Sequence, residues 1–224
     1  QAEIDAANNS IREKSGNEEA LYQSDVAVGR FRYSDINGDG QVTADDRTFL
    51  GNPSPKFSYG LNIGANYKNF DFGIFFYGVQ GNDIWNQLKW WHDFNPNFQG
   101  AKSYTALNDS WTPQNMNAKA PIQETKGSFS TTDVPNSYYI ENGSYLRAKN
   151  AQIGYVLPTA LVNKLKVDRV RVYVQAANLF TITKYTGVDP EIGQSQVEGS
   201  TAFGLDEGAY PNQRQFLFGI NLTF

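Results

Sequence analysis

Hydrophobic and polar residues alternate strictly along two stretches in the first half of the chain. The first stretch, Phe57–Tyr67, reads FSYGLNIGANY, with aromatic and aliphatic residues at odd-numbered positions and Ser, Gly or Asn between them. The second, Phe70–Gln80, reads FDFGIFFYGVQ and repeats the pattern, although Phe75 and Val79 interrupt its polar side. A period of two predicts a β-strand with one apolar and one wet face in each stretch.

Only Lys68 and Asn69 separate these stretches, which is the spacing of a two-residue hairpin. We expect Asn69 to supply the positive φ that such a turn needs. Ordinary strands run about five or six residues, whereas these are about twice as long. At roughly 3.3 Å per residue and a tilt near 40°, such a strand crosses an apolar layer about 25 Å thick. A long hairpin over a soluble core fits these two strands equally well.

The last ten residues read QFLFGINLTF and favour the membrane interpretation. Their alternate positions are all large and apolar: Phe216, Phe218, Ile220, Leu222 and Phe224. A soluble domain rarely exposes such a row, because it invites association with other chains. A bilayer solvates it. An amphipathic strand that ends on Phe resembles the final strands of bacterial outer-membrane barrels.

Two more alternating stretches bring the expected strands to five. They are 57–67, 70–80, 145–157, 169–181 and 214–224. The connections between them alternate short and long, as the turns and external loops of outer-membrane barrels do. We therefore predict an all-β fold, part of a large antiparallel transmembrane β-barrel. Its organisation is an extracellular segment 1–56, then strands 57–224 with long extracellular loops at 81–144 and 182–213.

In the stretch Tyr145–Leu157, Arg147 and Lys149 share the parity of Ala151 and Ile153. We therefore expect both basic side chains on the apolar side, at its rim, where they meet lipid headgroups or plain solvent.

Composition narrows the class of protein further. The mean hydropathy is −0.52 and no eighteen apolar residues run together, which excludes a transmembrane helix but not barrel strands. The absence of Cys removes disulfides and zinc-thiolate sites, and a net charge of −4 argues against nucleic acid as a partner. The chain opens on Gln1 without a signal peptide, so we expect it to be a piece of a longer precursor.

Residues 35–46 read DINGDGQVTADD and follow the oxygen-ligand spacing of an EF-hand loop, with Asp in place of the usual final Glu. The predicted structural Ca²⁺ ligands are Asp35, Asn37, Asp39, Gln41 through its carbonyl, Thr43 and Asp46. Gly40, at the sixth place, makes the sharp turn. No flanking helices are expected, and a polar turn cluster without metal is the alternative. The preceding residues 1–29 are expected to be solvated, with one short helix.

All four Trp residues fall in the first half of the long segment 81–143: Trp85, Trp90, Trp91 and Trp111. Indoles with polar neighbours stack on carbohydrate or are buried by a protein partner, so we predict ligand or lid contact; packing within the loop is the alternative. His92 is expected to be a polar loop residue. The acids of the second loop, such as Asp189 and Glu191, show no pairing pattern. No catalytic residues are identified, so an enzyme is not expected.

Four stretches together resemble the SusC/RagA family of TonB-dependent outer-membrane transporters. The first spans 33–86, from YSDINGDGQVTADD to GVQGNDIWN. The others read YLRAKNAQIGYVLP, RVRVYVQAANLFTITKYTGVDPEIG and GAYPNQRQFLFGINLTF. The resemblance covers more than half of the chain, in order. It implies a 22-stranded barrel with an N-terminal plug, energised through TonB and capped by a SusD-like surface lipoprotein. It also implies import of oligosaccharides, or peptides in some members, in a Bacteroidetes-type Gram-negative outer membrane.

The plug and the segment that contacts TonB, which the resemblance implies, are expected to lie outside these 224 residues. Five strands leave two open edges, whose backbone groups cannot be satisfied in lipid. The chain is therefore expected to pair with the remainder of the barrel, as its C-terminal strands. The alternative function is a secreted β-rich binding module with a dockerin-like calcium loop, which would stay soluble without detergent.

Overall fold

The structure is a computed structural model that describes residues 1–163, 167–192 and 203–224. It divides into two compact units. Unit 1 comprises Gln1–Gly51 and Asn86–Ile140, and unit 2 comprises Asn52–Trp85 and Glu141–Phe224. The N-terminal segment therefore shares a unit with most of the first long loop. The predicted second loop, 182–213, includes residues 193–202, which lie outside the described residues. No helix in the described ranges has the length and apolar character needed to cross a membrane.

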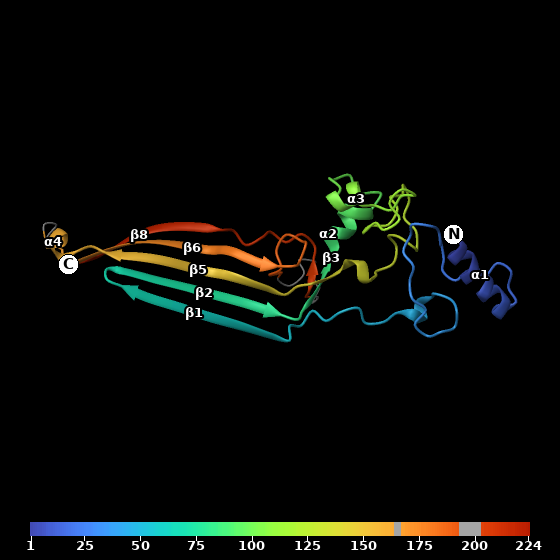
Figure 1. Cartoon of the computed structure of the whole chain (residues 1–224), viewed down its shortest axis with the longest axis horizontal. Coiled ribbons are helices and arrows are strands. Elements are labelled where there is room, and N and C mark those ends of the chain that lie inside the picture. The colour runs from blue at the N-terminus through green and yellow to red at the C-terminus, as the bar shows by residue number, and fades with distance from the viewer. Residues whose placement is uncertain (164–166, 193–202) are drawn as a thin grey trace. The chain divides into compact units, whose positions relative to one another are not determined.

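Unit 2 is built on a five-stranded antiparallel sheet whose strands follow one another in chain order (Figure 1). The strands are β1 (Phe57–Tyr67), β2 (Phe70–Gln80), β5 (Tyr145–Val156), β6 (Arg169–Thr183) and β8 (Gln215–Thr223). All five predicted strands are confirmed, with ends that differ by at most two residues. A short connection that contains helix α4 (Thr159–Val162) joins β5 to β6.

The turn between β1 and β2 has the predicted two residues, with Tyr67 paired to Phe70. The expected conformation of Asn69 is wrong, because the positive φ, 54°, belongs to Lys68. A positive φ at the first central residue alone is the pattern of a type II′ hairpin turn. The Lys68 ammonium lies over the Tyr67 ring, 5.3 Å from its centroid.

The pairing register aligns the apolar residues of all five strands on one face of the sheet. One row across the sheet consists of Ala65, Phe72, Ile153, Val174 and Phe218. The next row consists of Tyr67, Phe70, Tyr155, Val172 and Ile220. We call this surface the apolar face. Phe218 is 69% exposed and Ile220 is 55% exposed, so neither lies in a core formed by the described residues.

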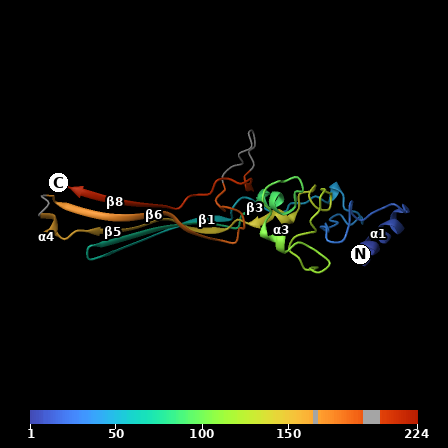
Figure 2. The same cartoon turned by 90° about the horizontal axis from the view of Figure 1, so that it is seen from above.

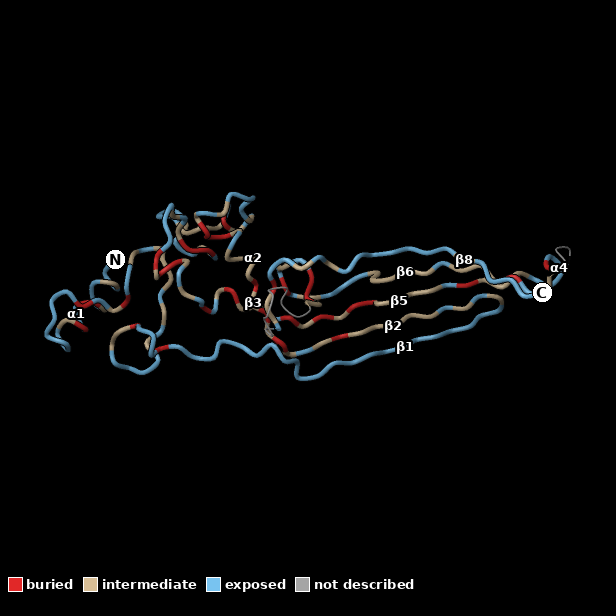
Figure 3. The backbone as a smooth tube through the Cα atoms, turned by 180° about the vertical axis from the view of Figure 1, so that it is seen from behind, coloured by how far each residue is buried: buried red, intermediate tan, exposed pale blue. Residues whose placement is uncertain are grey.

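The opposite side, which we call the polar face, carries small and polar residues. One of its rows consists of Gly64, Gly73, Gln152, Gln175 and Leu217. Another consists of Asn66, Asp71, Gly154, Tyr173 and Gly219. Along most of their length the five strands form a single layer, and the edge strands β1 and β8 are largely exposed (Figures 2 and 3).

A smaller three-stranded sheet lies within the predicted loops. Its order is β4 (Ile140–Asn142), β3 (Asp83–Asn86) and β7 (Leu205–Asp206). Ile84 and Asp206 are almost fully buried in it. These strands were not predicted, because two to four residues are too few to show a period.

Unit 1 contains short helices and irregular segments. Its elements are α1 (Ala2–Ser15), η1 (Ala44–Asp46), α2 (Gln87–Lys89), η2 (Trp90–Phe94), α3 (Tyr104–Asn108) and η3 (Ser137–Tyr139). The predicted short helix near the N-terminus is confirmed as α1, and most of its residues are exposed. This helix ends at Gly16 in the left-handed conformation and buries Asn8 and Ile11. The Asn8 side chain accepts a hydrogen bond from Tyr22 N at 2.9 Å, which ties the helix to the following segment.

The core of unit 1 joins segments that are far apart in the sequence. Gln23, 1% exposed, donates to Ser130 Oγ at 2.6 Å and to the Phe31 carbonyl at 2.8 Å. The Phe31 ring packs against Phe94 and Tyr138, with centroids 5.6 and 5.4 Å away. Much of the first long loop is therefore folded against the N-terminal segment, which explains why it carries so many aromatic residues.

Candidate functional site

Two features of the predicted calcium loop are visible in unit 1. Gly40 adopts φ +98°, a conformation that favours glycine and makes the sharp turn at the sixth place of the loop. Ile11 of α1 lies beside it, 3.2 Å from the position that a Cβ atom would occupy. No α-helix directly flanks the loop on either side, as predicted, and the short 3₁₀ helix η1 forms its last three residues.

The carboxylates of the loop accept hydrogen bonds from its own backbone. Asp35 accepts from Gly38 N and Gly40 N, both at 2.7 Å. Asp46, which is buried, accepts from Thr43 N at 2.7 Å and from Ile36 N at 2.7 Å. These backbone donors, Thr43 above all, hold the pKa of the Asp46 carboxyl below its ordinary value. The loop is thus wound around its acidic side chains.

Of the remaining predicted ligands, some side chains lie close together and others make different contacts. Asn37 Nδ2 donates to Asp39 Oδ2 at 3.1 Å, so these two side chains meet. The Gln41 side chain points away to the Leu21 carbonyl, which leaves only its backbone carbonyl for a metal. Thr43 Oγ1 accepts from Asp45 N and caps η1. Within the described ranges, no three His, Asp or Glu side chains converge closely enough to hold a metal by themselves.

The four Trp residues do not form one cluster. Trp90 and Trp91 pack edge to face, 4.6 Å apart, on the π-helical turn η2, where Asn95 N donates to the Trp90 carbonyl. Trp90 Nε1 donates to the Thr132 carbonyl at 2.9 Å. Trp111 lies against Gly29. Trp85 belongs to β3 of unit 2.

Trp91 is the only Trp among the exposed large hydrophobic residues of the described chain, at 37%. Its ring lies 5.8 Å from Phe98, which also stacks on His92 at 5.3 Å. The expected polar loop residue His92 therefore belongs to an aromatic patch with Trp91 and Phe98.

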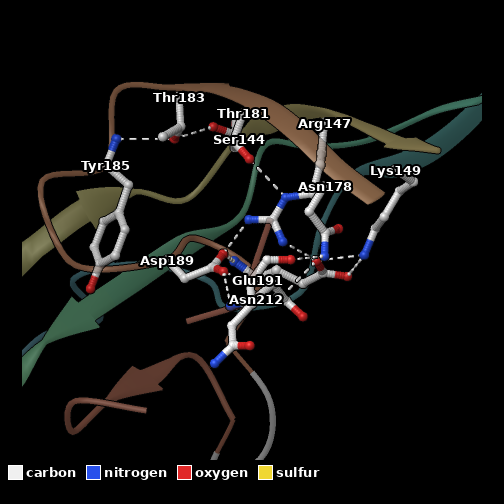
Figure 4. A network of polar contacts seen from close by, with 11 residues as sticks. Ser144, Arg147, Lys149, Asn178, Thr181, Thr183, Tyr185, Asp189, Glu191 and Asn212 are labelled. Atoms are coloured by element: carbon white, nitrogen blue, oxygen red, sulfur yellow. Dashed lines mark hydrogen bonds and ion pairs between the residues drawn. The ribbon is translucent and has the colours of Figure 1, made fainter. Parts of the chain in front are cut away.

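The second loop brings its acids to basic residues of β5, in a network that the sequence did not reveal (Figure 4). Arg147 donates to Asp189 at 2.5 Å and to Glu191 at 2.7 Å. Lys149 donates to both oxygens of Glu191, at 2.5 and 2.6 Å. Asn212 donates to Asp189 from its backbone at 2.9 Å. We call these five residues the charge cluster.

A double β-bulge explains why the predicted orientation of Arg147 is wrong. Between Asn150 and Ala148, β5 has one extra residue, Lys149, relative to β2. Opposite it, β6 also shifts register, and Asn178 there has φ 50°. An inserted residue reverses the facing of every residue beyond it. Arg147 therefore lies on the polar face rather than at the rim of the apolar face.

The facing of the neighbouring residues agrees with this reversal. Ala148 pairs with Phe76 and Phe180 and lies on the apolar face. The centroids of the Phe76 and Phe180 rings lie 6.2 Å apart. Arg147 is opposite Tyr77 and Thr181, and its Nε donates to Thr181 Oγ1 at 2.8 Å.

A second ion pair lies on the polar face nearer the short turns. Arg171 Nε donates to Asp71 Oδ2 at 2.8 Å, across the intervening strand β5. Gly154 of β5 permits this, because a Cβ there would collide with both partners. The Arg171 guanidinium also lies over the Tyr173 ring, 5.1 Å from its centroid.

The charge cluster predicts a defined pH response. Burial opposes ionisation of Asp189, but Arg147 and the N–H groups of Glu191 and Asn212 outweigh it and lower the pKa of Asp189. A lowered folded-state pKa contributes stability above the ordinary value of about 3.9, and this is lost as the pH falls through the folded-state value. Hydrogen exchange of residues 185–191, corrected for intrinsic rates, should stay slow from neutral pH to about 5 and accelerate below about 4. Asp189→Asn should remove most of this response; an equal response in that variant would contradict the assignment.

The sequence was compared with family models and with known proteins. No family model matches the chain. TonB-dependent receptor P3 of Formosa agariphila is 35% identical over 209 residues, covering 92% of this chain and 20% of the receptor. TonB-dependent receptor SusC of Bacteroides thetaiotaomicron is 29% identical over 193 residues, covering 86% of this chain and 17% of SusC.

Solved structures agree with these sequence matches. The RagAB peptide transporter superposes with a TM-score of 0.67 at 29% identity, covering 83% of this chain and 19% of that chain. The RagAB peptide importer in its open-open state gives a TM-score of 0.64 at 27% identity, with 92% and 22% covered. The chain therefore spans about a fifth of the length of these relatives.

The antiparallel sheet and these matches define a segment of a TonB-dependent transporter. Within that class, the chain belongs to the SusC/RagA family.

Proposed function

We propose that the chain forms the C-terminal wall of a SusC-like transporter barrel in the outer membrane of a Bacteroidetes-type bacterium. The observation that supports this most strongly is the apolar face, which runs without interruption across five strands and is exposed. Lipid tails solvate such a surface, whereas water would drive it to aggregate. A soluble secreted module with a dockerin-like calcium loop would leave this face in water.

The sheet also needs further strands. In the described chain, β1 and β8 each pair on one side only, and they run in the same direction because three strands alternate between them. An antiparallel barrel can join them only through an odd number of additional strands. A 22-stranded transporter barrel supplies seventeen beyond these five. The plug and the contact with TonB would then belong to the rest of the protein.

We propose oligosaccharide import with a SusD-like surface lipoprotein, and Trp85, Trp90, Trp91 and Trp111 as candidate ligand or lid contacts. Trp91 is the exposed ring of its aromatic patch and is of the kind on which sugars stack. Peptide import is the second candidate, supported by the similarity to the RagAB peptide transporter. No catalytic role is proposed, since the relatives are named as receptors and transporters.

Growth of a strain that lacks the complete transporter would test the substrate class. We expect loss of growth on defined oligosaccharides, with growth on the constituent monosaccharide retained. Loss of growth on peptides alone would establish peptide import instead. Unchanged growth on both, with the protein absent from the outer membrane of the parent strain, would contradict the proposed function.

We also propose that residues 35–46 bind a structural Ca²⁺ ion, with the predicted oxygen ligands. The carboxyls of Asp35 and Asp46 both accept hydrogen bonds from the backbone of the same loop, which gathers oxygen atoms of the kind that Ca²⁺ prefers. The left-handed Gly40 supports the same loop conformation. In the complete protein the ion would fix the loop against α1.

Asp39→Ala should lower the thermal stability of unit 1 only when calcium is present. At a free calcium concentration about 100 times Kd, binding contributes about 2.7 kcal/mol, which the variant would lose. Asp45→Ala is the matched control, because Asp45 is an exposed acid of the same loop outside the ligand set. Melting curves recorded with calcium and with a chelator provide the measurement. If Asp39→Ala and the parent melt alike under both conditions, there is no calcium site.

A further inference from the structure

The described parts of the second loop are attached to the rest of unit 2 at two places. The first is the charge cluster. The second is the hydrogen bond that Thr186 N donates to the Glu141 carboxylate at 2.8 Å. Within the loop, the buried side chains of Tyr185 and Asp206 share a hydrogen bond of 2.5 Å. Thr183 Oγ1 donates to the Ser144 carbonyl at 2.8 Å beside it (Figure 4). Both attachments join residues that are far apart in the sequence, so the described parts of the loop have a defined path.

The burial of Arg147 shows that part of the second loop lies over the polar face. Arg147 is 3% exposed although it lies on the polar face, where Asn62, Asn66 and Asn150 are all exposed. Its carboxylate partners come from the second loop, and the Asp189 side chain is itself only 9% exposed. The segment around Asp189 and Glu191 therefore covers the loop end of the polar face instead of projecting away from it.

The chemistry of the cluster fits a role in positioning. A guanidinium offers a planar fork of donors, so one Arg fixes two carboxylates in a defined geometry, which a Lys cannot do. Buried ion pairs contribute little net stability compared with apolar packing, but they are costly to break one partner at a time. Such a cluster selects one loop conformation from many.

We propose that the charge cluster is a latch that holds the segment around Asp189 and Glu191 inward, so that this segment narrows the wet passage lined by the polar face. This rests on the proposed function, because the polar face lines a passage only within the assembled barrel. Arg147 is the positioning residue of the latch. The segment then sets the size of molecule that reaches the polar face from outside, while the Arg171–Asp71 pair farther down the same face does not.

The chain has no cysteine, which allows a direct test of access. Asn150→Cys, on the polar face next to the bulge, would serve as the reporter in a complete transporter without other accessible thiols. Intact cells would be treated with a small maleimide and with a maleimide attached to a polyethylene glycol of several kilodaltons. Phe49→Cys, at a fully exposed position of unit 1, would control for general reactivity.

With the latch intact, the small reagent should label Asn150→Cys and the bulky reagent should not. Arg147→Gln should accelerate bulky labelling on the order of tenfold, because unpaired buried acids disfavour the closed loop. The double variant Asp189→Asn with Glu191→Gln should do the same, and combining all three changes should add little. Arg147→Lys should be intermediate. Arg171→Gln, which breaks the other ion pair on this face, should behave like the parent.

Heat-modifiable migration in gels would verify that each variant forms a barrel. If Arg147→Gln does not assemble, labelling of the shape-conserving double variant Asp189→Asn with Glu191→Gln provides the test of the latch instead. Parental rates in assembled latch variants, or equal acceleration by Arg171→Gln, would overturn the latch. A parent protein that forms no barrel at all would instead refute the proposed function.

Discussion

Phe218→Lys is expected to block assembly of the transporter or to destabilise it severely. Phe218 lies in an uninterrupted apolar row and is 69% exposed, so in the proposed barrel its side chain would contact lipid tails. A Lys on the lipid face of a barrel strand costs about 2–4 kcal/mol near the bilayer midplane. We expect little heat-modifiable barrel in the outer membrane and a lower urea midpoint for any protein that folds into detergent or vesicles.

Leu217→Lys is the matched control, because Leu217 is the adjacent residue of β8 and lies on the polar face. Both changes replace a large apolar side chain with the same ammonium group, and they differ only in the face that receives it. Leu217→Lys should therefore assemble at nearly parental levels. Equal damage from both variants, or none from either, would show that the two faces of β8 do not differ in their surroundings.

The strands could be predicted from the sequence because each is long and keeps a period of two. In β1, eleven residues alternate without a break, and the structure assigns the same eleven residues to the strand. The shortness of β3, β4 and β7 hid them, and their pairing depends on contacts between distant segments. Helix α1 was expected, but the burial of Ile11 was not, because local composition does not show which distant residues pack against it.

The face on which Arg147 lies could not be predicted from the sequence. Assigning odd and even positions to opposite faces of a strand is valid only where the strand pairing contains no bulge. The double bulge at Lys149 and Asn178 reverses the facing, and no Gly or Pro marks it in the sequence. Once the bulge is known, the acids of the second loop acquire partners. Asp189 and Glu191 then form ion pairs about forty residues from their partners in the sequence, a separation that no local pattern reveals.

The turn of the predicted calcium loop could be predicted from the sequence, whereas the grouping of the Trp residues could not. The predicted requirement for Gly40 is met by its positive φ, since this signal is local and stereochemical. The Trp residues were grouped by sequence proximity, but the structure distributes them over β3, η2 and the segment beside Gly29. Metal occupancy and ligand contact remain predictions for the experiments above.

Deletion of Lys149 is expected to prevent assembly, although Lys149→Ala should be tolerated. Removing the inserted residue restores an unbroken ladder between β2 and β5, and this moves Arg147 to the apolar face. A charge on the lipid face costs about 2–4 kcal/mol. The buried acids that lose Arg147 add about 3–5 kcal/mol. The sum is of the same order as the whole stability of a typical domain.

Lys149→Ala distinguishes the effect of the extra residue in β5 from the effect of the Lys149 charge. It removes one ammonium from the cluster but leaves the backbone count, the facing of Arg147 and the Arg147–Asp189 pair unchanged. Heat-modifiable migration of both variants in outer-membrane fractions provides the measurement. If the deletion assembles as well as Lys149→Ala, the bulge does not set which face Arg147 occupies.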